Sequence, residues 1–351
     1  MHVLAALAGA AVIALTLAEF FVAFILPRRV RHEPRIARLI LVVGWRVWRF
    51  VARRLPARSG DTMLGFYGPL LLLFAIFLWA VALIFGFALL QWAGGSHVVR
   101  VGTGGFDDDL FFSAGGFLSA SMQLSPSTSL ARGLFLGEAA CGFGVLFIAI
   151  GYLPMIYQAS ARREVAVAQL APRAGTPPTA GALLARAGRR GGWPDLDRYL
   201  AEWEGWAAEL METHLSHPAL AYFRSQHVGQ NWLAALTTVL DSCGFAIAAA
   251  PEQAQVEAAE ITFEIGQHAL ADLSHVLHAK PDRFDPPRLE GADFAVLWEL
   301  AASSGLDLRA KKEVEPRLSE LRARYEPLVA GLSRALELTP SAWLPPSGDA
   351  P

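Results

Sequence analysis

Three long apolar runs divide the chain, and each is long enough to cross a bilayer as a helix. The first runs from Val3 to Leu26 with Glu19 as its one charged residue, the second from about Leu64 to Trp92, and the third from about Leu134 to Tyr157. A helix needs roughly 20 apolar residues to cross the hydrocarbon core. The pattern therefore predicts three transmembrane helices. The first is expected to stay in the protein as an anchor, because its arginines follow the apolar run instead of preceding it.

Between the first two spans the pattern becomes that of a basic amphipathic helix over residues 36–55. Arginines occupy one helical face and aliphatic side chains another, and Trp45 and Trp48 suit the headgroup zone of a membrane. We expect this helix to lie on the membrane surface and to contact anionic lipid. A voltage sensor is excluded, because the arginines do not recur at every third position of a spanning helix. The arginines on the basic face are Arg38, Arg46, Arg49 and Arg53.

Beyond the third span the pattern is that of a water-soluble helical domain. A linker rich in proline and glycine, APRAGTPPTAG, leaves the span, and apolar residues then recur at helical spacing, for example from Trp203 to Leu210 and from Trp232 to Leu240. Residues 280–291 are expected to form a loop, followed by a charged helix over 313–338. We find no alternation of the kind that predicts strands.

Composition and charge placement add an orientation to this picture. The chain is 54% hydrophobic and 18% charged, and its two cysteines, Cys141 and Cys243, do not form a disulfide framework. The connection between the first two spans is rich in arginine, whereas the connection between the second and third spans carries Asp107, Asp108 and Asp109. The positive-inside rule then predicts an N-terminus outside and a cytoplasmic C-terminal domain, in a bacterial inner (plasma) membrane.

The segment SAGGFLSASMQLSPS, residues 113–127, is too polar to span a membrane and too apolar for an ordinary surface loop. DDDLFFSAGGFLS is expected to form a short helix whose dipole favours the aspartates at its N-terminus, and ASMQLSPS then returns to the outer surface. Irregular backbone at membrane depth is tolerated only where protein or a water-filled cavity surrounds it. A span, a short helix, a return and a second span form the pore unit of a tetrameric cation channel.

In these stretches the sequence resembles the potassium channel family, and more narrowly a group of bacterial potassium-channel-like membrane proteins. The resemblance covers most of the chain. It is carried by FILPRRV, FFSAGGFLSASMQLSPSTSLARGLFLGEA, IGYLPMIYQASARREV, PRAGTPPTAGALL and HPALAYFRSQHVGQNWLAALTTVLD. It implies a pore loop in each chain and four chains around one pore.

The family's selectivity filter has the form T-x-G-Y-G-D followed by a proline, and this chain departs from it. The resemblance aligns Pro126 with that proline and gives Glu138 a supporting role behind the pore loop. Alanine and methionine then stand where the filter needs glycines, at a cost of about 1 kcal/mol or more each in left-handed backbone. The hydroxyls of this stretch either line a less selective pore or satisfy a buried loop. The filter-equivalent residues are Leu118, Ser119, Ala120, Ser121, Met122 and Gln123.

Two further features of the membrane part have alternative interpretations. Gly142, Gly151 and Pro154 in the third span form a gating hinge or permit close helix packing. Glu19 is an ionisable residue within the first span and is therefore a functional candidate, but we expect a carboxylate that snorkels to the interface or pairs with an arginine such as Arg28 or Arg29.

One helix of the soluble part carries a weak candidate for a metal site. Glu264, His268, Asp272 and His275 follow one another at intervals of four, four and three residues, which puts them on one helical face. One helix rarely completes a site, so His214 and His217 would have to supply the remaining ligands. We predict no metal, no cofactor and no nucleic acid as a partner.

The sequence as a whole predicts an all-α membrane protein with three transmembrane helices, a re-entrant pore helix and loop, and an all-α cytoplasmic domain. The predicted domains are 1–63, with the first span and the basic helix, 64–160, which is channel-like, and 161–351, which is cytoplasmic. We expect a homotetramer that passes K⁺, or monovalent cations less selectively. The alternative is a non-conducting channel fold that carries a helical sensing or binding domain. We expect no enzyme activity, because no catalytic constellation is present.

Overall fold

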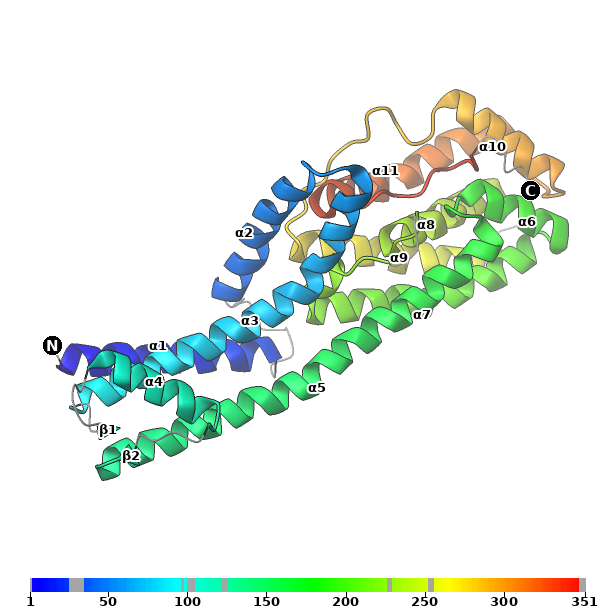
Figure 1. Ribbon diagram of the computed structural model, residues 1–351. Coiled ribbons are helices and arrows are strands. Elements are labelled where there is room, and N and C mark those ends of the chain that lie inside the picture. The colour runs from blue at the N-terminus through cyan, green and yellow to red at the C-terminus, as the bar shows by residue number, and fades with distance from the viewer. Residues whose placement is uncertain are drawn as a thin grey trace. The chain divides into compact units, whose positions relative to one another are not determined.

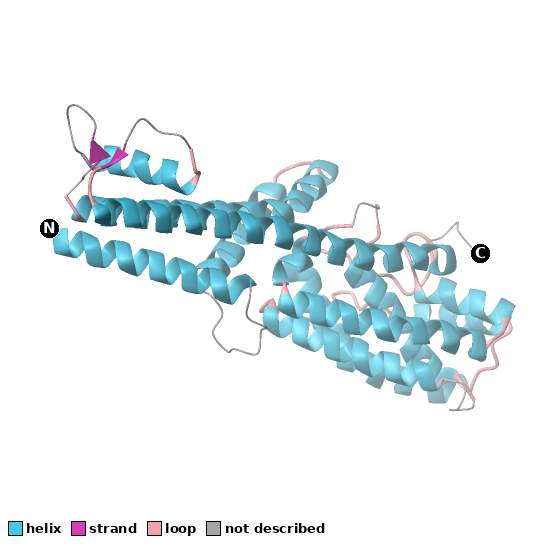
Figure 2. Ribbon diagram, turned by 90° about the horizontal axis from the view of Figure 1, so that it is seen from below, coloured by secondary structure: helices cyan, strands magenta, loops and turns pink. Residues whose placement is uncertain are grey.

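The computed structural model describes residues 2–24, 35–95, 98–99, 105–120, 125–225, 229–251 and 256–346. The chain forms two compact units, Met1–Tyr157 and Gln158–Pro351. The domain boundary predicted after residue 160 lies three residues from this division. Apart from the two-residue strands β1 and β2, the regular secondary structure of the described residues is helical, so the predicted all-helical fold is confirmed (Figures 1 and 2).

The first unit contains the predicted spans. Its elements are α1 (His2–Phe24), α2 (Arg35–Ala52), α3 (Ala57–Ala93), β1 (Val98–Val99), α4 (Phe106–Phe117), β2 (Ser125–Pro126) and the first part of α5 (Ser129–Ala174). Each predicted span falls within α1, α3 or α5, except for Ile25 and Leu26, which lie outside the described residues. The helix α3 begins seven residues before the predicted second span, because the polar residues at its start continue the same helix.

Four helices of the described chain are long and apolar enough to cross a membrane, one more than the sequence analysis predicted. The additional one is α8 (Trp232–Ala249). Its apolar window is completely buried inside the structure, whereas only 22%, 28% and 17% of the windows in α1, α3 and α5 are buried. Among the described residues, the large exposed apolar side chains also belong to the first unit, apart from Val165, Ile261 and Val296. The first unit therefore has the apolar surface that lipid or neighbouring subunits would cover.

The helices α1 and α3 pack closely because small residues face each other where they meet. A side chain at Gly9 would lie 2.7 Å from the carbonyl oxygen of Gly86, and one at Gly86 would lie 2.7 Å from Ile13. Nearby, the rings of Phe20 and Trp79 meet edge to face with centroids 5.5 Å apart. Close approach at small residues is the usual way in which helices associate in a membrane.

The basic amphipathic helix is confirmed as α2, and its tryptophans pack on protein. Trp45 is buried with its ring centroid 4.9 Å from that of Tyr67 on α3. Trp48 donates from Nε1 to the carbonyl oxygen of Met63 at 2.8 Å. Val47 and Phe50 remain exposed on α2. The described part of α2 thus attaches to α3 through its aromatic residues, while aliphatic and aromatic side chains elsewhere on it stay uncovered.

The second unit is a helical bundle around α8. Besides the end of α5 it contains α6 (Ala180–Arg190), α7 (Trp193–Ser216), the 3₁₀ helix η1 (Pro218–Tyr222), α8, α9 (Glu257–Val276), α10 (Gly291–Ser303) and α11 (Lys311–Leu336). Helices α6, α7, α9 and α11 all contact α8, which explains why every residue of this helix is buried. The loop expected over 280–291 connects α9 to α10, and the charged helix expected over 313–338 is α11; both predictions are confirmed.

Candidate functional site

The segment between α3 and α5 returns to the place where it starts. The strand β1 pairs antiparallel with β2, and in this register Val98 faces Pro126 while Val99 faces Ser125. Figure 2 shows the two short strands beside the beginning of α4. Because this pairing joins the two ends of the segment, Val99 and Ser125 lie side by side at the same end of the first unit.

The helix α4 occupies the middle of this excursion and is too short to cross a bilayer. It has 12 residues, about 18 Å at 1.5 Å per residue, against a hydrocarbon core of about 30 Å. Its first turn carries Asp107, Asp108 and Asp109, where the helix dipole favours negative charge. The short helix predicted from DDDLFFSAGGFLS is thus present.

A serine ends α4 in the left-handed conformation that glycine usually adopts. Ser119 has φ of +52° and donates its backbone N–H to the carbonyl of Gly116 at 3.1 Å. The backbone N–H of Ala120 bonds to the carbonyl of Gly115 at 2.9 Å. These two bonds form a Schellman cap, which satisfies carbonyls that the end of a helix leaves open. The left-handed conformation costs serine about 1 kcal/mol of conformational free energy relative to glycine. This cap is therefore less stable than one that ends in glycine.

The helix α4 packs on α5 through small residues. A side chain at Gly142 would collide with the carbonyl oxygen of Phe117, and one at Gly116 would lie 3.0 Å from the ring of Phe135. The rings of Phe112 and Phe135 lie with centroids 5.2 Å apart across the same contact. Gly142 is therefore a packing residue, which was one of the two interpretations made from the sequence.

The other residues of the predicted hinge are in open positions. A side chain at Gly151 would meet nothing within 4 Å, and the same holds for Gly144. Pro154 is exposed within α5, which continues without interruption from Ser129 to Ala174. The packing argument that explains Gly142 does not extend to Gly151 and Pro154, whose predicted hinge role stays a prediction.

Three polar side chains on α4 and α5 are buried. Asp109, Ser113 and Glu138 are all fully buried. The carboxylate of Glu138 would lie 3.2 Å from a side chain at Gly116 on α4. Glu138 therefore lies against α4, and the supporting role behind the pore loop that the resemblance implies stays a prediction. The return residues 121–124 lie outside the described residues.

The structure describes half of the filter-equivalent residues. Leu118, Ser119 and Ala120 follow α4 and are exposed. Ser121, Met122 and Gln123 lie outside the described residues. Pro126 belongs to β2, and its carbonyl accepts a hydrogen bond from Nε of Arg132 at 3.4 Å.

The start of α5 is fixed to α3. Thr128 caps the helix by accepting a hydrogen bond from the backbone N–H of Ala131 at 3.2 Å. The buried side chain of Gln91 on α3 donates from Nε2 to the carbonyl of Ala131, also at 3.2 Å. Both ends of the excursion are thereby held by protein contacts.

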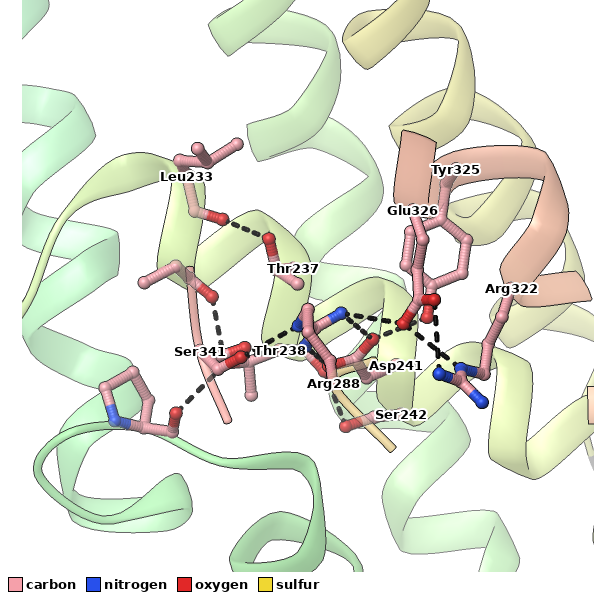
Figure 3. A network of polar contacts seen from close by, with 12 residues as sticks. Leu233, Thr237, Thr238, Asp241, Ser242, Arg288, Arg322, Tyr325, Glu326 and Ser341 are labelled. Atoms are coloured by element: carbon pink, nitrogen blue, oxygen red, sulfur yellow. Dashed lines mark hydrogen bonds and ion pairs between the residues drawn. The ribbon is translucent and has the colours of Figure 1, made fainter. Parts of the chain in front are cut away.

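The second unit contains a buried ionic network, shown in Figure 3. Arg288, in the loop before α10, forms a two-pronged ion pair with Asp241 on α8. Tyr325 on α11 donates to the same carboxylate at 2.5 Å. Arg288 also contacts Glu326 at 3.2 Å and donates to the carbonyl of Ser341 at 2.8 Å. Burial opposes the charge of Arg288, but Asp241 and its neighbours hold its pKa above the ordinary value.

This network has the character of a structural clamp. Asp241 is fully buried and the Arg288 side chain is 6% exposed, and buried charges persist only when they are paired and hydrogen-bonded. The network joins α8, α11, the loop before α10 and the C-terminal segment. Burial raises the pKa of the Tyr325 hydroxyl well above its ordinary value, so this group stays a hydrogen-bond donor.

A second buried arginine ties the end of α5 to its neighbours in the second unit. Arg163 donates to the carbonyl oxygens of Leu220 and Phe223 at 3.0 and 2.8 Å, and to Nε2 of His214 at 3.1 Å. It also pairs with Glu164 at 2.8 Å. Nδ1 of His214 donates to the carbonyl of Leu210 at 2.8 Å. The sequence analysis did not single out Arg163, because nothing local in ARREV marks it as buried.

The structure does not assemble the candidate metal ligands. His268 contacts Asp272 at 3.4 Å, but both are at least partly exposed, and Glu264 pairs instead with Arg324 at 2.7 Å. His214, one of the two ligands that would have to complete the site, is buried beside Arg163. Within the part of the chain that the structure describes, no three histidine, cysteine or acidic side chains come together to hold a metal ion.

Comparisons with known proteins give no match: no family model, no curated protein and no solved structure resembles the chain significantly.

Proposed function

We propose that four copies of this chain surround the segment between α3 and α5 and form a pathway for monovalent cations across a bacterial inner membrane. The observation that supports this most directly is the pairing of β1 with β2, because it brings the segment back to its starting end. An excursion that contains a 12-residue helix and returns suits a re-entrant pore loop better than a span.

The exposed end of α4 supports the same proposal. Leu118 is 71% exposed in the single chain, directly before the left-handed Ser119. A large apolar side chain at membrane depth needs lipid or a neighbouring subunit around it. Four such ends around one axis would place backbone carbonyls and the Ser119 hydroxyl along a water-filled path. In this arrangement the N-terminus lies outside and the second unit is cytoplasmic.

The experiment is ion flux into liposomes that contain the purified chain. We expect uptake of K⁺, Na⁺ or both above the background of empty vesicles, and loss of that uptake in Ala120→Trp. Leu4→Trp is the matched control, because Leu4 is an exposed apolar residue of α1, outside the re-entrant segment. A chain with the mass of a monomer in detergent, or uptake equal to background, would contradict the proposal.

A non-conducting scaffold is the second candidate, and one observation favours it. Ser119 adopts the left-handed backbone conformation, which is less favourable for serine than for glycine, and Ala120 and Met122 stand where a filter would use glycines. The test is to restore the filter with Ala120→Gly, Ser121→Tyr, Met122→Gly and Gln123→Asp. K⁺ flux that appears only in this variant supports the scaffold, whereas a parent chain that already conducts rejects it.

A further inference from the structure

The second unit contains a cavity with four arginines among its ten lining residues. Its volume is about 340 Å³, within the range of small-molecule pockets. It lies where the end of α5 meets α6 and the first half of α7. Arg173 comes from α5, Arg186 and Arg190 from α6, and Arg198 from α7. A neighbouring cavity of about 200 Å³ shares Arg173 and Arg186 and adds Arg189.

The acidic residues of the cavity do not balance this positive charge. Asp195 pairs with Arg198 at 2.8 Å, and Glu202 lies 3.8 Å from Arg173. Both of these pairs are solvent-exposed and therefore weak. Among the described residues, Arg186, Arg189 and Arg190 form no ion pair. The two cavities together thus carry an excess of three positive charges from five arginines and two acids.

Two buried polar atoms in the larger cavity have no hydrogen-bond partner among the described residues. They are Nε of Arg186 and the hydroxyl of Tyr199, whose neighbours Arg173 and Trp203 are donors only and cannot accept its proton. Tyr199 is only 8% exposed, and burial raises the pKa of its hydroxyl, which remains a donor. Buried donors without partners are rare in folded proteins, and each needs an explanation. A ligand with acceptor oxygens in this cavity would supply both missing partners.

The guanidinium of Arg173 is already oriented at the cavity. Its central carbon lies 4.0 Å from the centroid of the Tyr199 ring, which is cation–π contact distance. Stacking holds a flexible side chain in one place, so that less conformational entropy is lost when it binds an anion.

Helix stability accounts for part of this cluster only. Arg189 and Arg190 lie in the last turn of α6, where the helix dipole favours cations. The dipole does not explain Arg186, which lies one turn earlier and faces the cavity, or the convergence of Arg173 and Arg198 from two other helices.

We propose that this cavity binds a small organic phosphate with two or more negative charges, such as a nucleotide. Guanidinium groups bind phosphate oxygens through two parallel N–H bonds, which matches an acceptor-rich ligand to Arg186 and its neighbours. The hydroxyl of Tyr199 donates to the same oxygens. This site is independent of the ion pathway, because all of its residues belong to the second unit.

The test is calorimetric titration of the full chain with ATP, with inorganic pyrophosphate and with adenosine, in nanodiscs of phosphatidylcholine. We expect saturable binding of ATP or pyrophosphate and none of adenosine. Arg186→Gln with Arg190→Gln should weaken binding roughly tenfold or more, and Arg186→Lys should weaken it less, because the charge remains while the two-pronged contact is lost. Arg283→Gln is the matched control, since Arg283 is an exposed arginine away from the cavity.

Nanodiscs that also contain phosphatidylglycerol separate a soluble ligand from a lipid headgroup. Unchanged ATP affinity in these nanodiscs supports a soluble phosphate, and competition by the lipid assigns the same phosphate site to a headgroup. The proposal is overturned if neither phosphate compound binds saturably, or if the double variant, with unchanged helical content, binds as tightly as the parent chain.

Discussion

At the scale of single residues, the contact between α4 and α5 depends on the absence of a side chain at position 142. A methyl group there would collide with the carbonyl oxygen of Phe117, whereas a methyl group at Gly144 would meet nothing within 4 Å. Position 142 thus has no room for a side chain, whereas position 144 does. The sequence around the two glycines does not indicate this difference.

We predict that Gly142→Ala destabilises the first unit and that Gly144→Ala does not. Overpacking a close contact costs about 1–3 kcal/mol, while alanine in an open helical position gains up to about 1 kcal/mol of helix propensity. Thermal unfolding in detergent, followed by tryptophan fluorescence, measures both. Equal melting temperatures for the two variants would show that α4 does not rest on Gly142.

His214 gives the second unit a dependence on pH. Burial, with the charge of Arg163 beside it, lowers the pKa of His214 well below its ordinary value of about 6.5. The unfolded chain therefore binds a proton in mild acid that the folded chain does not bind, and the folded state loses stability as the pH falls below about 6.5.

We predict that lowering the pH from 7.5 to 5.5 removes about 1.4 kcal/mol of stability through this residue alone. His214→Gln should lose that part of the pH dependence, whatever its stability at pH 7.5. His275→Gln, which changes an exposed histidine of α9, should keep it. The measurement is the melting temperature of each variant at the two pH values, and identical pH dependence in all three proteins would contradict the prediction.

At the scale of elements, the ionic network around Asp241 explains how α8, α11 and the C-terminal segment stay together. The carboxylate is completely buried and depends on Arg288 and Tyr325 for its partners. Removing one member leaves a buried charge without compensation, which is far more costly than the loss of an exposed pair.

We predict that Arg288→Met lowers the melting temperature of the second unit by roughly 6–20 °C, from a loss of about 3–5 kcal/mol. Arg324→Met is the matched control, because Arg324 forms its ion pair with Glu264 at the surface; the expected loss is about 1 kcal/mol or less. If Arg324→Met lowered the melting temperature as much as Arg288→Met, the buried network would contribute no more to stability than an exposed ion pair.

Local pattern predicted the helices better than the contacts between them. The spans, the basic helix and the charged helix α11 follow from periodicity within each segment, and α4 follows from DDDLFFSAGGFLS. The partners of Asp241 are 47 and 84 residues away along the chain. Arg163 finds its acceptors in η1 and just beyond it, 57 and 60 residues later. No pattern in the sequence encodes such pairs, because each partner is ordinary in its own segment.

The same limit applies to the two candidate sites. The arginines of the cavity belong to three helices, and each arginine alone is typical of a solvated helix face. The metal candidate differs from the arginine cavity, because its ligands have a suitable spacing on α9 but do not form a site. Glu264 pairs with Arg324 instead. Sequence spacing relates residues within one helix only, whereas a binding site needs side chains from several neighbouring helices to lie close together.

At the scale of the whole molecule, the account depends on the return of residues 100–124 to the side from which they leave. The test uses single cysteines at Asp107, in the first turn of α4, and at Ser127, just after β2; both residues are exposed. The background carries Cys141→Ala and Cys243→Ala, and Glu320→Cys reports the side of the membrane on which we propose that the second unit lies. We predict that an impermeant thiol reagent added from outside modifies both Asp107→Cys and Ser127→Cys in intact cells, and modifies Glu320→Cys only after the membrane is opened. Labelling of Asp107→Cys and Ser127→Cys from opposite sides would contradict the account.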